Sequence, residues 1–350
     1  MPDENQINKK ISDSVNPDYY IKKGKLNNAD EYADGIKKGD RSTLSRAITF
    51  IESTKNEYRE LGQAILEKCY GLTGHSIRIG ITGVPGVGKS TFIEKFGMHL
   101  IEQGKKVAVL AIDPSSSITK GSILGDKTRM ETLAVHENAY VRPTPAAGIL
   151  GGVAGKTREA ILLCEASGFD IIIVETVGVG QSETSVKSMV DFFLLLMLAG
   201  AGDELQGIKR GIMETADMIV INKADGENIH NANRARLEYQ QALSLFPPQP
   251  SGWKAPVKTA SSLDNTGIKE VWDVLKQYHN QVTQNGFFAN NRKNQSVQWL
   301  HEAIGFQLKH QFYSRPNVKK NLDRLEKEIL SGKISPPFAA SELMNPSVQE

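Results

Sequence analysis

Short apolar runs alternate with amphipathic stretches between Ser76 and His279, and this alternation dominates the chain. Several runs are apolar at nearly every position, which is typical of parallel strands covered on both faces. The predicted strands are residues 76–82, 106–113, 139–143, 170–175, 191–198, 217–222 and 255–260. Helical spacing of apolar residues occurs between them at residues 91–103, 157–167 and 267–284. The pattern therefore predicts an α/β fold with a doubly wound, mostly parallel sheet.

Other patterns flank this region. Residues 1–39 are polar with little periodicity and are expected to form a loose arm, whereas apolar spacings of three and four within residues 40–75 predict two helices. After residue 286, two amphipathic helices are predicted from two apolar stripes: Val297, Leu300, Ile304 and Leu308, and then Val318, Leu322, Leu325 and Ile329. These stripes either pack on their own domain or pair with a second subunit. The last residues, 335–350, are expected to be frayed.

The expected organisation is therefore an arm (1–39), N-terminal helices (40–75), an α/β domain (76–285) and a C-terminal helical extension (286–350).

The composition of the chain argues against some classes of partner and location. Apolar residues make up 39% and charged residues 23% of the chain, and the formal net charge is +2, so no large basic field favours a nucleic-acid partner. The longest apolar run, residues 192–202, is too short to span a membrane. The polar N-terminus and two isolated cysteines favour a reducing cytoplasm.

The segment GVPGVGKST, residues 83–91, matches a phosphate-binding loop between a predicted strand and a predicted helix. Glycines let backbone N–H groups converge on phosphate oxygens, and the helix N-terminus adds partial positive charge. Lys89 is expected to reach the β- and γ-phosphates, and the Ser90 hydroxyl to bind Mg²⁺. The residues assigned to this loop are Gly83, Val84, Pro85, Gly86, Val87, Gly88, Lys89, Ser90 and Thr91.

A second motif indicates guanine as the base. Asn222-Lys223-Ala224-Asp225 ends a predicted strand and resembles the N-K-x-D motif of GTPases. The Asp225 carboxylate can accept two hydrogen bonds from guanine, whereas adenine offers no such pair of donors. Lys223 is expected to lie along the base and Asn222 to link this loop to the phosphate loop. The segment Ser261, Ser262 and Leu263 stands where GTPases place a loop whose backbone contacts the guanine oxygen.

Acidic residues follow two other predicted strands and suit a metal ion. Asp113 and Glu175 stand at the carboxyl ends of their strands, where ligands bind in such sheets. Mg²⁺ prefers oxygen ligands and keeps several waters, so Ser90 with one or two carboxylates suffices. Asp126 is a further candidate metal or switch residue, and Lys89, Asp113 and Glu175 are the residues expected to act in catalysis.

The run after Glu175 has the character of a nucleotide-sensing switch. Gly178 and Gly180 permit backbone rearrangement, and Gln181 belongs to the same segment. No Gln follows Gly178 directly, where Ras-like proteins keep the residue that orients water. Intrinsic hydrolysis is therefore expected to be slow and to be stimulated by a partner.

The blocks GVPGVGKST, AIDPSSS, ETVGVGQSE, AGAGDELQGIK and NKAD together resemble the MeaB/ArgK family of GTPases over about residues 39–310. The resemblance implies a homodimer joined partly through C-terminal helices, with Mg²⁺ and GTP or GDP in each subunit. It implies a G-protein chaperone that gates adenosylcobalamin loading into methylmalonyl-CoA mutase or a related acyl-CoA mutase, and protects or reactivates that enzyme. By similarity, Asp113, Asp126 and Glu175 serve Mg²⁺ and switching, and Asp203 and Lys209 belong to a loop that responds to the mutase.

Three alternatives stay open at this point. A metallochaperone GTPase would need a Cys/His cluster, which the isolated cysteines and seven histidines do not suggest. A transport-associated kinase or ATPase would need to accept ATP, against which NKAD argues. A GTP-binding scaffold without turnover is compatible with every motif.

Overall fold

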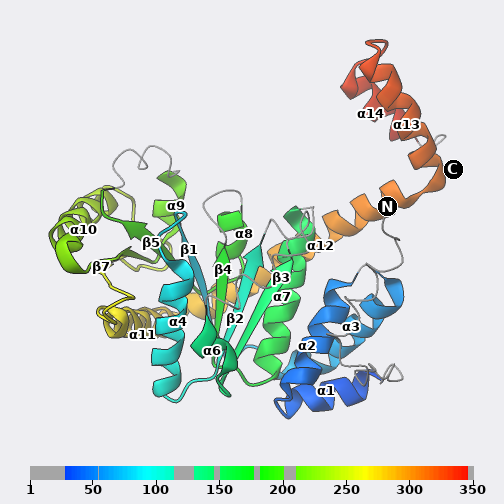
Figure 1. Cartoon of the computed structure of the whole chain (residues 1–350). Coiled ribbons are helices and arrows are strands. Elements are labelled where there is room, and N and C mark those ends of the chain that lie inside the picture. Colours follow the sequence, from blue (N-terminus) through cyan, green and yellow to red (C-terminus); the bar gives the residue numbers. More distant parts are fainter. Residues whose placement is uncertain are drawn as a thin grey trace, which may run out of the picture.

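The computed structural model describes residues 28–53, 55–113, 130–145, 150–176, 182–200 and 210–345. Its centre is a seven-stranded parallel sheet in the order β3-β2-β4-β1-β5-β6-β7 (Figure 1). The strands are β1 (Ile77–Gly83), β2 (Val107–Asp113), β3 (Ala139–Pro145), β4 (Ile171–Thr176), β5 (Phe192–Leu198), β6 (Met218–Asn222) and β7 (Val257–Thr259). The seven predicted strands and the α/β fold class are thereby confirmed.

Helices flank this sheet on the connections between strands. They are α4 (Lys89–Glu102), α6 (Glu131–Val135), α7 (Leu150–Ala166), α8 (Ser182–Lys187), α9 (Arg210–Thr215), α10 (Ile229–Ser244) and α11 (Ile268–Gln284). Helix α4 contacts α6 and α11, whereas α7 contacts α8 and the C-terminal helix α12 (Phe287–Ser314). The helices thus form two groups, as a doubly wound sheet requires.

The central strands are buried because both faces are covered. Every residue of β4 and β6 is buried, and β4 pairs with β1 in the register Ile79↔Ile173. The longest apolar run of the sequence forms β5, which lies between β1 and β6 in this sheet. No helix in the described part of the chain has both the length and the apolar character needed to cross a bilayer.

Among the described residues from 28 onward, three α-helices precede the sheet: α1 (Ala29–Lys37), α2 (Arg41–Glu52) and α3 (Asn56–Cys69). The last two confirm the predicted pair, but α1 contradicts the expectation of an irregular arm through residue 39. Asn28 caps α1 by accepting a hydrogen bond from the Glu31 backbone N–H, and Tyr32 and Ile36 are buried against the neighbouring helices. The sequence does not predict α1 because its two buried apolar side chains lie one helical turn apart in a polar segment. One such spacing is too short a pattern to indicate a helix.

The C-terminal region forms α12, α13 (Pro316–Leu330) and α14 (Pro336–Leu343). The first part of α12 passes behind the sheet, and its later part continues with α13 and α14 away from the sheet (Figure 1). Helix α14 shows that the expectation of a frayed tail is wrong over residues 336–343. Ser335 accepts a hydrogen bond from the Phe338 backbone N–H at its N-terminus, and Leu343 packs against Val318 and Leu325 of α13. The second apolar stripe therefore packs within its own chain.

A network of buried charges anchors the start of α12 to the sheet. Arg292 donates to Asp191 at 2.6 Å, to the Ser76 carbonyl at 2.6 Å and to Glu165 at 3.5 Å. Glu165 also accepts two hydrogen bonds from Arg78 at 2.8 and 2.9 Å. Burial raises the pKa of Glu165, but its bonds to Arg78 and Ser76 and the charge of Arg292 outweigh that effect and lower the pKa overall. Glu165 stays charged because Arg78 and Arg292 face it.

Replacing Arg292 tests this anchor. Arg292→Met leaves Asp191 and Glu165 with fewer positive partners in a buried setting, and we expect a loss of about 3 kcal/mol in the free energy of unfolding. Arg234→Met is the matched control, since Arg234 only pairs with Glu238 on the surface of α10 and its removal should cost about 0.5 kcal/mol or less. Denaturant unfolding of both variants measures the difference. Equal losses would show that the network does not stabilise the fold.

Candidate nucleotide-binding site

The phosphate loop lies at the carboxyl end of β1, between β4 and β5. Connections leave the adjacent strands β1 and β4 in opposite directions, and ligands bind such sheets at this point. Gly83 allows β5 to approach, because a Cβ there would lie 2.5 Å from the Leu196 carbonyl oxygen. Gly88 precedes α4 with a φ of 87°, a conformation that residues with a side chain rarely adopt. The loop therefore has the backbone shape that its sequence predicts.

Lys89 folds back over this loop. Its Nζ donates hydrogen bonds to the carbonyl oxygens of Gly83 at 2.9 Å and of Val84 at 3.3 Å. The charged end of the side chain is thus held beside the loop backbone and at the N-terminus of α4. A cation in this position faces the place where the loop would hold phosphates.

Ser90 and Glu175 meet at the ends of α4 and β4. The Ser90 hydroxyl donates to Glu175 Oε1 at 3.2 Å, and the Glu175 side chain is buried. A hydroxyl and a carboxylate at this spacing form an oxygen donor set that suits Mg²⁺. Asp113 ends β2, which pairs with β4, so its backbone lies near the same edge of the sheet. Within the described residues, no group of three or more His, Cys, Asp and Glu side chains could hold a metal ion.

Two threonines that the sequence patterns did not single out join the same strands. The buried Thr176 hydroxyl donates to Thr82 Oγ1 at 2.7 Å, directly beside Glu175 and Gly83. In the sequence each threonine simply stands at the end of an apolar run. That position does not indicate a hydrogen bond between the two side chains. The bond ties together the backbones that carry the loop and the acidic residue.

The NKAD segment is linked to the phosphate loop. The buried Asn222 side chain donates to the Val87 carbonyl oxygen at 2.8 Å, which is the link expected from the sequence. Lys223 has a φ of 57° and its Cε lies 3.9 Å from the position of a Cβ built at Gly88. The lysine stem therefore passes beside the phosphate loop.

The loop after β7 supports the NKAD segment through side chains. Ser261 Oγ donates to Asp225 Oδ2 at 2.6 Å, and Ser262 Oγ donates to Asn222 Oδ1 at 3.2 Å. The sequence predicts a contact of this loop with guanine through its backbone and does not predict these serine bonds. Leu263 is exposed and makes no comparable contact.

The structure thus brings together the phosphate loop, Lys89, Ser90 and Glu175, the NKAD segment and the loop of residues 261–263. Six of the residues named from the sequence lie outside the described residues: Asp126, Gly178, Gly180, Gln181, Asp203 and Lys209. For Asp113 only the backbone position is described.

A parallel α/β sheet with a phosphate loop after β1 and an N-K-x-D segment after β6 defines the class of P-loop GTPases. The particular family follows from comparison with known proteins. The family described as methylmalonyl Co-A mutase-associated GTPase MeaB matches residues 44–317. The chain belongs to this family.

Individual relatives support this family assignment. The chain is 49% identical over 315 residues to a "Probable GTPase" of Mycobacterium tuberculosis, covering 90% of this chain and 94% of that protein. It is 46% identical to "GTPase ArgK" of Escherichia coli, covering 88% and 93%. It is 44% identical to the mouse "Methylmalonic aciduria type A homolog, mitochondrial", covering 90% and 78%. A crystal structure described as a LAO/AO transport system kinase has a TM-score of 0.71 at 37% identity, covering 90% of this chain and 96% of that one.

Exchange of the base-reading carboxylate tests the NKAD segment. In Asp225→Asn the amide oxygen can still accept from Ser261, but the amide nitrogen faces the guanine amino group donor to donor. We expect GTP affinity to fall about 10²-fold, roughly 3 kcal/mol, and affinity for XTP to rise, since xanthine carries a carbonyl there. Titration of both nucleotides measures this. Asp264→Asn, in the neighbouring loop, is the control and should leave the preference unchanged; a mutant of Asp225 that still prefers GTP would contradict base reading by this residue.

Proposed function

We propose that the protein is a Mg²⁺-dependent GTPase of low intrinsic rate that acts as a chaperone for an adenosylcobalamin-dependent acyl-CoA mutase. Methylmalonyl-CoA mutase is the first candidate, because the family description names it and the mouse relative is a methylmalonic aciduria type A homolog. The observation that carries the GTPase part is the hydrogen bond from Asn222 to Val87, which joins a base-reading segment to a phosphate loop. The role includes gating of cofactor loading and protection or reactivation of the mutase.

Each residue of the site has a chemical role in this proposal. The backbone of residues 83–88 and Lys89 bind the phosphates and offset the charge that develops during hydrolysis. Ser90 and Glu175, with Asp113 and Asp126, hold Mg²⁺, which polarises the phosphate oxygens when bound. Asp225 and Lys223 select guanine. Nothing in this set activates water strongly, which agrees with slow hydrolysis in the absence of a partner.

The coupling to the partner is assigned to four residues of the sequence. Gly178 and Gln181 lie in the sequence between Thr176, the last residue of β4, and Ser182, the first residue of α8. Asp203 and Lys209 lie between β5 and α9. Both segments follow the carboxyl ends of strands that border the site, where a γ-phosphate sensor is expected.

A cytoplasmic location is proposed with this role, and neither a membrane nor a nucleic acid is needed as partner.

A homodimer is also proposed, and the first stripe of α12 supports it. Four apolar side chains of this helix are exposed: Val297 by 57%, Leu300 by 58%, Ile304 by 44% and Leu308 by 61%. They line one side of the helix over three turns, and such a stripe favours burial against another helix. A second copy of the chain offers the same stripe, so a symmetric contact buries both.

The alternatives are less well supported. A metallochaperone GTPase needs soft ligands, and both cysteines are buried far into the fold, with burial raising the pKa of the Cys69 thiol to about 11. A transport-associated kinase or ATPase is suggested by the description of one solved relative, which is a statement about that protein. The NKAD segment and the relatives named GTPase favour GTP for this chain.

Hydrolysis with and without the mutase tests the proposed function. We expect slow turnover of GTP by the protein alone, faster turnover with purified methylmalonyl-CoA mutase, and little turnover of ATP. Lys89→Ala should lower the rate by a factor on the order of 10², because it removes a cation beside the phosphates. Lys95→Ala, an exposed lysine of the same helix, is the control. A rate that the mutase does not change would overturn the chaperone role, and a normal rate in Lys89→Ala would overturn the catalytic role of the loop.

Sedimentation velocity tests the dimer. Leu300→Glu combined with Ile304→Glu places charges on the exposed stripe, which should convert a dimer into a monomer that still binds GTP. Lys309→Glu changes the charge on another side of α12 and should leave the dimer intact. A wild-type monomer, or a double variant that stays dimeric, would contradict pairing through this stripe.

A further inference from the structure

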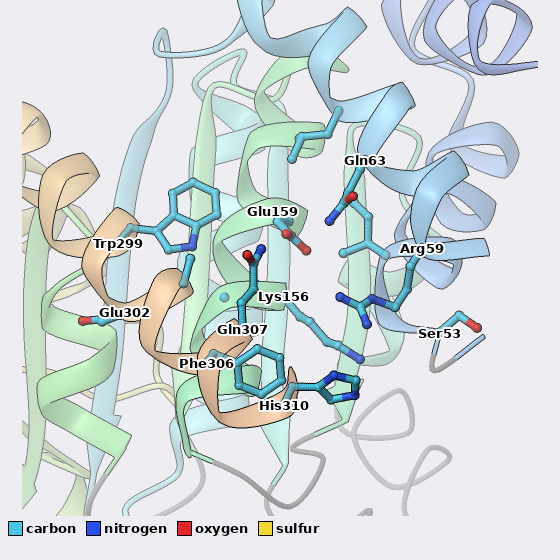
Figure 2. A pocket seen from close by; sticks show the side chains of 14 residues that line it. Ser53, Arg59, Gln63, Lys156, Glu159, Trp299, Glu302, Phe306, Gln307 and His310 are labelled. Carbon is cyan, nitrogen blue, oxygen red and sulfur yellow. The ribbon is translucent and has the colours of Figure 1, made fainter. Parts of the chain in front are cut away.

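A pocket of about 240 Å³ lies between the N-terminal helix α3, the sheet-covering helix α7 and the C-terminal helix α12 (Figure 2). None of its lining residues belongs to the phosphate loop, the NKAD segment or the loop of residues 261–263. An engineered apolar cavity of about 150 Å³ accommodates benzene, so this pocket has room for an aromatic ring with a substituent. The pocket is therefore separate from the nucleotide-binding residues.

Aromatic side chains of α12 form one part of its wall. Figure 2 shows Trp299 and Phe306 on the same helix, about two turns apart, both lining the pocket. The Arg158 guanidinium lies 6.0 Å from the Trp299 ring centroid and also bonds Glu302, which fixes this part of α12 against α7. Phe306 stacks with His310 at a centroid distance of 6.4 Å. Flat apolar surface is therefore available to a bound ring.

Positive charge gathers on the opposite part of the wall. Arg59 of α3 and Lys156 of α7 both line the pocket, and the Lys156 ammonium is held by the Glu52 carbonyl oxygen at 2.6 Å (Figure 2). In the described part of the chain, the Arg59 guanidinium and the Glu159 carboxyl have no hydrogen-bond partner. Both side chains are partly exposed, so water can reach them, and a ligand in the pocket can bond both.

Glu159 does not cancel this positive charge at neutral pH. Burial raises its pKa to about 7, although the charges of Lys156 and Arg59 act in the other direction. The remaining acid of the wall, Glu302, is paired with Arg158. An anion therefore meets two cations and one carboxyl that is protonated in part of the molecules.

We propose that this pocket binds a small aromatic anion, with its ring against Trp299 and Phe306 and its carboxylate or phosphate on Arg59 and Lys156. The site is independent of the proposed GTPase function, since it uses other residues. A ligand there contacts all three of α3, α7 and α12, so it also holds the C-terminal extension against the sheet domain.

Calorimetric titration of the full-length protein, with its nucleotide site saturated by GDP and Mg²⁺, tests the proposal with four probes. Indole-3-acetate and AMP each combine a ring with an anion, one as carboxylate and one as phosphate. Adenosine lacks the anion and inorganic phosphate lacks the ring. We expect at least one of the first two to bind about tenfold or more tightly than either of the last two, and its identity distinguishes the two anion chemistries. Equal binding of all four, or none of any, would overturn the proposal.

Variants locate the binding. Arg59→Gln should lower the affinity for the tighter-binding probe by about tenfold. Arg46 is an exposed arginine of α2 outside the pocket, so Arg46→Gln should not change this affinity. Trp299→Leu should also weaken it, and a normal thermal unfolding profile shows that the variants fold. Unchanged affinity in both Arg59→Gln and Trp299→Leu would place the probe elsewhere and overturn the site.

The pH dependence gives an independent measure with indole-3-acetate, whose carboxylate stays ionised. The charged and titratable groups that line the pocket together with Glu159 are Arg59 of α3, Lys156 of α7, and Glu302 and His310 of α12. Ionisation of Glu159 repels the anion, so affinity should fall by up to about tenfold from pH 6 to pH 8. Glu159→Gln should bind more tightly than wild type at pH 8 and should lose most of the change in affinity between pH 6 and pH 8. A variant as sensitive to pH as wild type would overturn the placement of the anion beside Glu159.

Discussion

The hydrogen bond from the Asn222 side chain to the Val87 carbonyl is the interaction on which the proposed site depends. It joins the end of β6 to the phosphate loop after β1, two strands that are separated in the sheet by β5. Because the amide is buried, the bond competes little with water and defines the distance between the base-reading and phosphate-binding segments. Ser262 completes it by donating to the amide oxygen, so the side chain has a single orientation.

The parallel sheet supplies the second constraint. The carboxyl ends of β1 and β4 are adjacent, and the Thr82–Thr176 bond ties them together beside Glu175. A glycine at residue 83 is needed because the β5 backbone passes too close for any side chain. The Ser90 hydroxyl lies within hydrogen-bond distance of the Glu175 carboxylate. Ser90 stands at the start of α4 and Glu175 near the end of β4, and the alignment of β1 with β4 brings these two positions together. The pair of oxygen donors proposed for Mg²⁺ is therefore a consequence of strand alignment.

The C-terminal extension depends on α12 being held at its beginning and middle. Arg292 bonds Ser76 and Asp191, which directly precede the central strands β1 and β5, and Glu302 bonds Arg158 of α7. The apolar stripe of α12 stays exposed. The pocket at α3, α7 and α12 lies beside the second of these attachments. A buried charge pair gives little stability by itself, but it specifies where the helix sits, and so where its exposed stripe and its aromatic wall are presented.

The sequence by itself determined the seven strands, the main helices, the phosphate loop and the NKAD segment. These follow from apolar periodicity and from glycine and lysine spacing, which act over a few residues and leave a local signal. Only the tertiary structure decided that Ser261 and Ser262 hold Asp225 and Asn222, that α14 covers the stripe of α13, and that Arg59 and Glu159 face one cavity. Each of these pairs joins elements whose approach depends on how whole helices and strands pack, and no short-range pattern encodes that distance.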